Sequence, residues 1–195
     1  MAEQLSLIPP EIVPLDAHPE IQVWAYTNHV EQWPEQTMAQ IYTFMRSDHL
    51  PPLFWRDGIP HSLNQFICWT SDPTRIVLIV TCCEEITTLT LDHIMGLCWL
   101  DEIEGPHAAV HFWVRKKFWW GKRPHIAAQK VLQLVFQQMP WLYLLTCRVN
   151  SQNRLALKFM QQIGARIVGE IPDWYQHGET RYAATFGYLP RMSLE

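Results

Sequence analysis

The sequence predicts one α/β domain of the α+β type, in which helices flank a mixed, mostly antiparallel sheet. Three observations carry this prediction. The chain has 195 residues, 48% of them hydrophobic, which is enough for a single sizeable core. Three short apolar runs between residues 76 and 114 have the lengths and residue types of strands. After residue 123, amphipathic helical patterns alternate with strand patterns, an order typical of a sheet packed against helices.

The first third of the chain predicts one strand and two helices. Residues 1–20 hold four prolines and favour an extended lead-in, because proline fixes φ and removes a backbone donor. Gln22–Thr27 has the pattern of an edge strand. Apolar residues recur at helical spacing over Pro34–Arg46, and Pro34 suits a first helical turn. Leu50–Pro60 is expected to be a loop with aromatic anchors, and Leu63–Trp69 a short helix.

The rest of the chain predicts six strands and two further helices. The strands are expected at Ile76–Val80, His93–Leu100, Ala108–Val114, Leu142–Cys147, Arg166–Glu170 and Arg181–Leu189. The helices are expected at Pro124–Gln138 and Arg154–Ile163, the second followed by Gly164 at a position favoured for helix termination. Glu104–Pro106 should form a turn, and Pro172–Gly178 an aromatic loop between the last two strands. We expect residues 1–195 to form a single domain.

Composition excludes several classes of protein. The formal net charge is −4 and charged residues make up 17% of the chain, too few for a disordered or polycationic protein. The longest apolar run, around residues 76–80, is too short to span a bilayer, and Met1–Pro10 lacks the features of a signal peptide. The five cysteines are odd in number and lie in apolar surroundings, which predicts free core thiols in a reducing cytoplasm.

The segment Arg-Lys-Lys-Phe-Trp-Trp-Gly-Lys-Arg-Pro, residues 115–124, carries five of the fifteen basic residues between an expected strand and an expected helix. Such a junction exposes unpaired backbone N–H groups and the positive end of the helix dipole. Gly121 permits close backbone approach, and Pro124 suits the first helical turn. These features fit an anion site for a phosphate or pyrophosphate. They fit a solvated basic turn that caps a helix equally well.

Together with the segment that follows, this pattern resembles the GNAT-type N-acetyltransferases, which bind acetyl-coenzyme A (acetyl-CoA). In that family a strand leads to a loop of the form Gln/Arg-x-x-Gly-x-Gly/Ala, and a later strand leads to Asn-x-x-Ala/Ser and a helix. Phe118–Arg123 matches the loop, and Asn153–Ala156 matches the second motif, with Gly164 closing the helix. The resemblance spans about residues 76–189 and is closest to the branch of ribosomal-protein N-terminal acetyltransferases and related phage proteins.

The resemblance implies that the strands 108–114 and 142–147 splay apart to admit the pantetheine arm of acetyl-CoA. It also implies the cofactor-binding residues, which are Trp113, Val114, Phe118, Trp119, Trp120, Gly121, Lys122, Arg123 and Asn153. The sequence departs from the family at Phe118, where Gln or Arg is usual, at Arg123, where Gly or Ala is usual, and at Ala165, where Phe is usual. An outward-pointing Arg123 can itself meet a phosphate.

Acetyl transfer to an amine needs a base for the amine, and a proton assists the departing thiolate. Many relatives use a Glu on the strand before the loop or a Tyr on the second helix. Here that strand carries no carboxylate, and Met160 stands at the Tyr position. His111 lies on the strand, and histidine ordinarily titrates near pH 6.5, so His111 is the candidate catalytic base. A packing histidine is the other interpretation. His107 shares its face, but no metal-binding motif accompanies the pair, and we expect no metal.

Acidic and aromatic residues near the expected opening allow two interpretations each. Asp101, Glu102 and Glu104 would attract a cationic acceptor, or form a solvated turn. The aromatic residues of the expected loop 172–178, and Trp119 with Trp120, would line the acceptor or cofactor pocket, or simply pack.

The leading functional expectation is acetyl-CoA-dependent transfer of an acetyl group to an amine, by direct attack in a ternary complex. The acceptor is a small amine, a peptide N-terminus or a lysine. The alternative is a non-catalytic GNAT-fold module, related to phage proteins, that binds coenzyme A or serves as an interaction module. The negative net charge disfavours nucleic-acid binding through the basic segment. We expect a cytoplasmic protein with no membrane partner, and a homodimer is left open.

Overall fold

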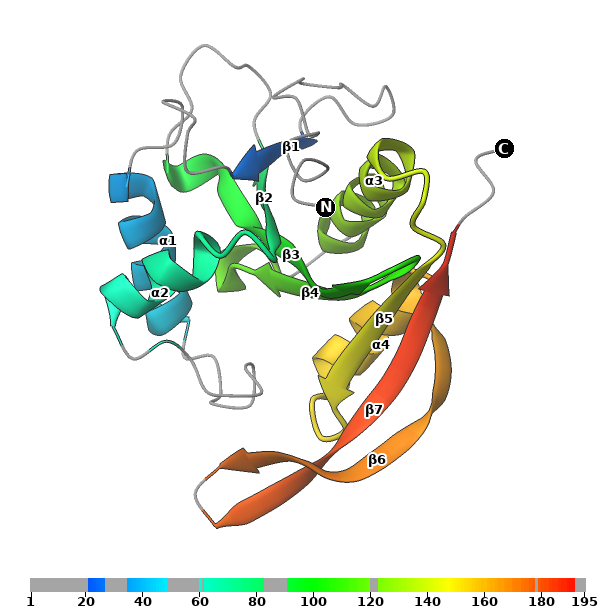
Figure 1. Ribbon diagram of the computed structural model, residues 1–195. Helices are drawn as coiled ribbons and strands as arrows, with labels where there is room; N and C mark the ends of the chain where they lie inside the picture. The colour runs from blue at the N-terminus through cyan, green and yellow to red at the C-terminus, as the bar shows by residue number, and fades with distance from the viewer. Residues whose placement is uncertain are drawn as a thin grey trace.

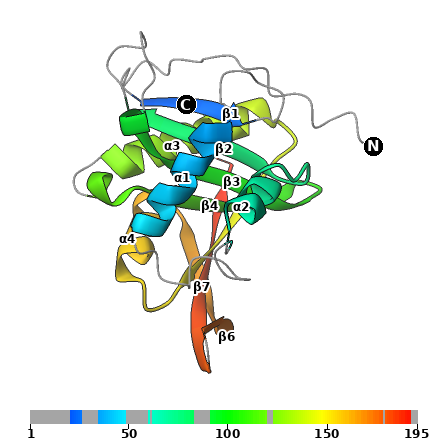
Figure 2. The same ribbon diagram turned by 90° about the vertical axis from the view of Figure 1, so that its left-hand side faces the viewer.

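Seven strands form a single sheet in the order β1-β2-β3-β4-β5-β7-β6, and helices cover both of its faces (Figures 1 and 2). The computed structural model describes residues 21–26, 35–48, 60, 62–82, 91–119, 123–177 and 179–191. The strands are β1 (Ile21–Tyr26), β2 (Ile76–Cys82), β3 (Ile94–Glu104), β4 (His107–Val114), β5 (Leu144–Asn150), β6 (Arg166–His177) and β7 (Thr180–Pro190). The helices are α1 (Glu35–Ser47), α2 (Leu63–Thr70), α3 (Arg123–Gln138) and α4 (Arg154–Gln162). The predicted lead-in 1–20 and the predicted loop 50–60, apart from Pro60, lie outside the described residues.

The directions in which neighbouring strands pair agree with the predicted fold class. All neighbouring pairs are antiparallel except β4 and β5, which run parallel. The α/β class with a mixed, mostly antiparallel sheet is confirmed, and β1 lies at the edge as predicted. The expected elements are present with ends shifted by a few residues, and His93 belongs to a short 3₁₀ turn rather than to β3.

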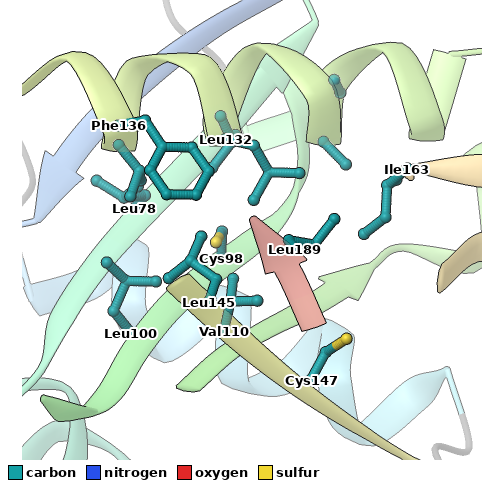
Figure 3. Packing of buried hydrophobic residues seen from close by; sticks show 14 of the residues in the cluster. Leu78, Cys98, Leu100, Val110, Leu132, Phe136, Leu145, Cys147, Ile163 and Leu189 are labelled. Carbon is teal, nitrogen blue, oxygen red and sulfur yellow. The ribbon is translucent and has the colours of Figure 1, made fainter. Parts of the chain in front are cut away.

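The two faces of the sheet bury separate apolar clusters. On one face, residues of α3 and α4 pack against the strands, with Phe136 and Leu132 of α3 above Leu78, Cys98 and Leu145 (Figure 3). On the other face, α1 and α2 cover a second cluster, whose large side chains include Met38, Ile41, Phe66, Trp99 and Trp113. Alternation along β3 and β4 produces this division, because successive side chains of a strand point to opposite faces. Among the described residues, no helix is long and apolar enough to cross a membrane.

The last two strands are longer than predicted. The segment expected as an aromatic loop, Pro172–Gly178, continues β6 as far as His177, and Tyr175 pairs with Tyr182 of β7. A register shift between Ile171 and Tyr175 absorbs the residues that disfavour a strand, and Asp173 lies there at φ 55°. The bulge therefore allows the aromatic residues that follow, which are good strand formers, to keep pairing.

The prediction that the cysteines are core thiols is wrong at one position. Cys98 and Cys147 are buried and Cys82 is half-buried, but Cys68 is exposed on α2. Helical periodicity explains the difference, since Phe66 and Thr70 of the same helix face inward. These four cysteines are free thiols, as predicted, and Cys83 lies outside the described residues.

Candidate functional site

The sheet opens between β4 and β5, as the sequence predicts. The two strands pair only over three residues, from His107 opposite Leu144 to Ala109 opposite Thr146. Beyond that point β4 continues to Val114 and β5 to Asn150, but the two strands no longer pair with each other. The part of the sheet formed by β5, β7 and β6 turns away from the rest (Figure 1). The free length of both strands leaves backbone groups available to a ligand.

The open edge of β4 carries the backbone groups of alternate residues. The amide of Arg115 donates to the carbonyl of Met95 on β3, so by alternation Val114 and Phe112 direct their backbone groups away from β3. The carbonyl of Val114 accepts a hydrogen bond of 2.7 Å from Nε1 of Trp119. Trp113, which was also predicted to contact the cofactor, does not face the opening. Its backbone pairs with Leu97 of β3, and its side chain is buried in the cluster under α1 and α2. Of the two predicted contacts on β4, the geometry favours Val114.

A narrow apolar pocket lies beside this open edge, below the start of α3. Its lining includes Gly96 of β3, Phe112 and Val114 of β4, Pro124 and Ala127 of α3, and Phe159 of α4. Phe112 and Phe159 touch edge to face, with ring centroids 5.7 Å apart. The pocket therefore joins β3, β4, α3 and α4.

Gly96 is required where β3 passes β4, and this yields a first prediction. A Cβ at Gly96 would lie 2.0 Å from the carbonyl oxygen of Trp113, so the backbone of β4 would have to move. We expect Gly96→Ala to lower the free energy of unfolding by about 1–3 kcal/mol, as overpacking does. Gly169→Ala is the matched control, because a Cβ there meets nothing within 4 Å. Urea unfolding of both variants checks this, and equal stabilities would contradict it.

The basic segment after β4 divides into two parts. Arg115 and Lys117 contact the fold through their side chains, and Lys116 does so through its backbone amide. The buried guanidinium of Arg115 donates to the carbonyl of Ile94 and lies 3.6 Å from the ring centre of Phe44, and burial lowers its pKa. The Lys116 amide donates to Asp48, and Lys117 Nζ contacts Asp92. For these residues the structural interpretation holds.

The second part of the basic segment contains the predicted anion loop. Trp120, Gly121 and Lys122 lie outside the described residues. Arg123 is exposed at the start of α3, where its Nη1 lies 3.8 Å from Sγ of Cys82. Phe118 ends a short 3₁₀ turn and packs against the core cluster under α3. Of the two basic residues in this loop, Lys122 and Arg123, the structure describes Arg123.

Asn153 has a structural role. It is the N-cap of α4, and its Oδ1 accepts a hydrogen bond of 3.1 Å from the amide of Ala156. Gly164 follows the helix at φ 92°, the left-handed conformation predicted for it. Met160 is buried against the core. The contact of Asn153 with a cofactor stays a prediction.

His111 lies on the opposite face of β4, toward α1 and α2. Its Nε2 lies 2.9 Å from Oδ1 of Asp101 on β3, and its ring stacks on Trp99 with centroids 5.0 Å apart and planes 5° from parallel. Trp69 of α2 meets Trp99 edge-on at 5.2 Å. The His111 side chain is 24% exposed, so the anchored ring is still partly open to solvent.

Asp101 is ionised at neutral pH. Burial raises the pKa of its carboxyl group, but the hydrogen bond and charge of His111 and the charges of Arg75 and Arg148 outweigh burial, and the net shift is downward. Asp101 is thus a carboxylate that can only accept a hydrogen bond from the imidazole.

The sequence did not predict a second polar pair across the opening. Arg148 of β5 lies one alternate position beyond the last β4–β5 pair, on the face of His111. Its Nη2 donates to Oε2 of Glu102 at 2.6 Å, and its guanidinium lies 5.4 Å from the Trp174 ring centre. Glu102 has φ 49° at a bulge in β3, which turns its side chain toward β5. Two of the three predicted acidic residues therefore have basic partners.

The remaining candidates are less central. Burial raises the pKa of Tyr175, although the charge of Arg148 opposes this. His107 Nδ1 lies 3.3 Å from the backbone carbonyl of Glu104, at the hairpin turn. Within the described ranges, no three His, Cys, Asp or Glu residues are arranged to hold a metal ion.

Solved structures of the same fold include several acetyltransferases. Spermidine N-acetyltransferase from Vibrio cholerae, in complex with CoA and spermine, matches with a TM-score of 0.70 and 12% identity over 88% of this chain and 96% of that chain. Ribosomal-protein-S5-alanine acetyltransferase from Vibrio fischeri matches with a TM-score of 0.67 and 11% identity over 90% and 96%. A dodecameric structure of the Vibrio cholerae enzyme matches with a TM-score of 0.65 and 12% identity over 88% and 94%.

Neither the models of known protein families nor the curated proteins match the sequence. At this level of identity the likeness to solved structures establishes the fold, which is that of the GNAT-type N-acetyltransferases.

Proposed function

We propose that this protein is an acetyl-CoA-dependent N-acetyltransferase that transfers the acetyl group to an amine by direct attack in a ternary complex. The observation that carries the proposal is the opening between β4 and β5, with the free edge of β4, the apolar pocket and the start of α3 on one face and His111 on the other. A thioester held at this edge would lie between its binding elements and a titratable side chain.

The residues at the opening fit acetyl-CoA chemically. The backbone amide of Val114 suits a carbonyl of pantetheine, since the Val114 carbonyl already accepts from Trp119. The apolar side chains around the narrow pocket suit contact with the hydrocarbon parts of the arm. Arg123, with Trp120, Gly121 and Lys122, suits the pyrophosphate at the start of α3. Phe118 and Trp119 precede these positions in sequence, and Asn153 is proposed to approach the cofactor from the start of α4. When bound, acetyl-CoA supplies a thioester whose thiolate is a good leaving group.

His111 is the proposed general base, which takes a proton from the acceptor amine. No acid replaces Met160, and thiols ordinarily titrate near pH 8.5, so the thiolate departs without one. A covalent acetyl-cysteine is disfavoured because burial raises the pKa of Cys98 and raises that of Cys147 to about 12. These thiols stay protonated and poorly nucleophilic.

The acceptor is a small amine, a peptide N-terminus or a lysine. The fold match to a ribosomal-protein acetyltransferase is compatible with the branch suggested by the sequence, but equally good matches to spermidine acetyltransferases do not favour it. The competing function is a non-catalytic module that binds coenzyme A. The burial of Met160 and the absence of a carboxylate from β4 favour that alternative.

Thermal unfolding with ligands separates these functions from nucleic-acid binding. A ligand at 100 times its Kd stabilises the folded state by about 2.7 kcal/mol, which raises the Tm of a domain this size by roughly 5–10 °C. We expect such a shift with acetyl-CoA and with CoA, and none with single-stranded DNA. A shift with DNA alone would favour the basic segment as a nucleic-acid site, and no shift with either CoA form would refute the proposed function.

A further inference from the structure

Two contacts fix the ring of His111, and a third supports one of them. Asp101 holds Nε2, Trp99 covers one ring face in parallel stacking, and Trp69 supports Trp99 from α2. The ring therefore has one rotational setting, while about a quarter of the side chain stays exposed. A histidine that only filled space would not need a carboxylate in contact with one nitrogen.

The contact with Asp101 also determines which nitrogen of neutral His111 is basic. A carboxylate has no proton to give, so the hydrogen in this contact belongs to Nε2. The lone pair of the neutral ring is then on Nδ1. Within the part of the chain that the structure describes, Nδ1 forms no hydrogen bond.

We propose that Asp101 is a positioning residue that holds His111 in the Nε2–H form and so makes Nδ1 the atom that accepts the proton from the acceptor amine. This inference rests on the proposed function and specifies its base. The amine electron pair forms the bond to the acyl carbon, the carbon–sulfur bond breaks and the thiolate leaves. The proton from the amine nitrogen passes to Nδ1. The imidazolium that results is stabilised by the Asp101 carboxylate.

The charges around the pair come from three other places. Arg75, after α2, and Arg148, on β5, both act on Asp101, and Glu102 pairs with Arg148. Trp69 and Trp99, the remaining close groups, do not titrate. Asp72 pairs with Arg75 at 2.6 Å, as Glu102 does with Arg148. Removal of the Asp101 charge would leave His111 with no carboxylate in contact, which disfavours its protonated form.

The test uses Asp101→Asn, with Glu104→Gln as a control for charge on the same strand. We expect Asp101→Asn to lower turnover at least tenfold and to move the inflection of the pH–rate profile to lower pH. A neutral amide gives the imidazolium less stabilisation and can hold the wrong tautomer. Glu104→Gln should leave the inflection in place. Asp101→Glu keeps a carboxylate, so its turnover and inflection should lie between those of Asp101→Asn and the wild type. An unchanged profile in Asp101→Asn would overturn the proposal.

A second measurement does not depend on activity. Nitrogen NMR shifts of His111 in the wild type, above its titration, should show a protonated Nε2 and an unprotonated Nδ1, and Asp101→Asn should alter this ratio. The opposite tautomer in the wild type would overturn the proposal. If the tautomer is as expected but no amine is acetylated, the proposed function fails, and Asp101 only orients the ring. If an Asp101→Asn sample is unfolded by circular dichroism, the wild-type tautomer and the Asp101→Glu profile decide.

Discussion

Replacement of His111 by alanine is expected to lower the turnover number at least tenfold, within the range of about 10²–10⁴-fold that loss of a general base typically costs. The amine acceptor is mostly protonated at neutral pH, and solvent is a poor substitute for a positioned base. The inflection between about pH 6 and 7, where histidine ordinarily titrates, should disappear from the pH–rate profile. The affinity for acetyl-CoA should change little, because His111 lies on the face of β4 opposite the apolar pocket.

His107→Ala is the matched control for this variant. His107 lies on the same strand and has the same side chain, but it is exposed and contacts the hairpin carbonyl of Glu104 instead of a side chain at the opening. We expect its activity and pH profile to follow the wild type. Full activity with an unchanged profile in His111→Ala would make His111 a packing residue and leave deprotonation to solvent, Asp101, Glu102 or Glu104.

The second large effect is expected at the predicted phosphate loop. Gly121→Glu introduces bulk and a negative charge where backbone amides should meet the pyrophosphate, so acetyl-CoA affinity should fall well over tenfold while the protein stays folded. Arg123→Ala should weaken binding less, by about 1.5–3 kcal/mol, the contribution of a hydrogen bond to a charged group. Isothermal titration calorimetry measures both effects.

Gly169→Glu controls for the added charge and bulk in this experiment. Gly169 is exposed on β6, and a Cβ there meets no atom within 4 Å, so its acetyl-CoA affinity should equal that of the wild type. Wild-type affinity in both Gly121→Glu and Arg123→Ala would mean that this loop does not bind the phosphates.

Much of the fold could be predicted because its signals are local. The apolar run at residues 76–80, the helical spacing over 124–138 and the helix stop at Gly164 each depend on neighbouring residues alone. The strand through Trp174 was missed for the same reason, since Pro172 and Asp173 are local signals for a loop. Pairing with β7, which a sequence window does not contain, overrides them.

The chemistry of the site was harder to predict, because its contacts join distant strands. His111 was found from its residue type and its strand, but its contact with Asp101 follows from the register of β3 against β4. Arg148 reaches Glu102 across 46 residues of sequence, and only the bulge that turns Glu102 explains this pair. The sequence offered one indication of this pair. Alternation along β5 places the side chain of Arg148 on the other face of the sheet from the buried Cys147.

The same limit explains the basic segment. The sequence treats its five basic residues as one cluster, but Asp92 before β3 engages the ammonium group of Lys117. Asp48 at the end of α1 accepts only the backbone amide of Lys116. Arg115 is buried over Phe44 of α1. The count of charges was right, but tertiary contacts tie Arg115 and Lys117 to the fold, and a binding role for Lys122 and Arg123 stays a prediction.

The central claim is that the opening between β4 and β5 holds acetyl-CoA for transfer to an amine. The most direct measurement incubates the full chain with acetyl-CoA and a panel of small amines, peptides with free N-termini and lysine peptides. Thiol release and the mass of each acceptor are followed together. We predict equal amounts of free coenzyme A and acetylated amine for at least one acceptor class, both strongly reduced in His111→Ala. Binding of acetyl-CoA with no transfer to any amine of the panel would contradict the account and leave a non-catalytic coenzyme A-binding protein.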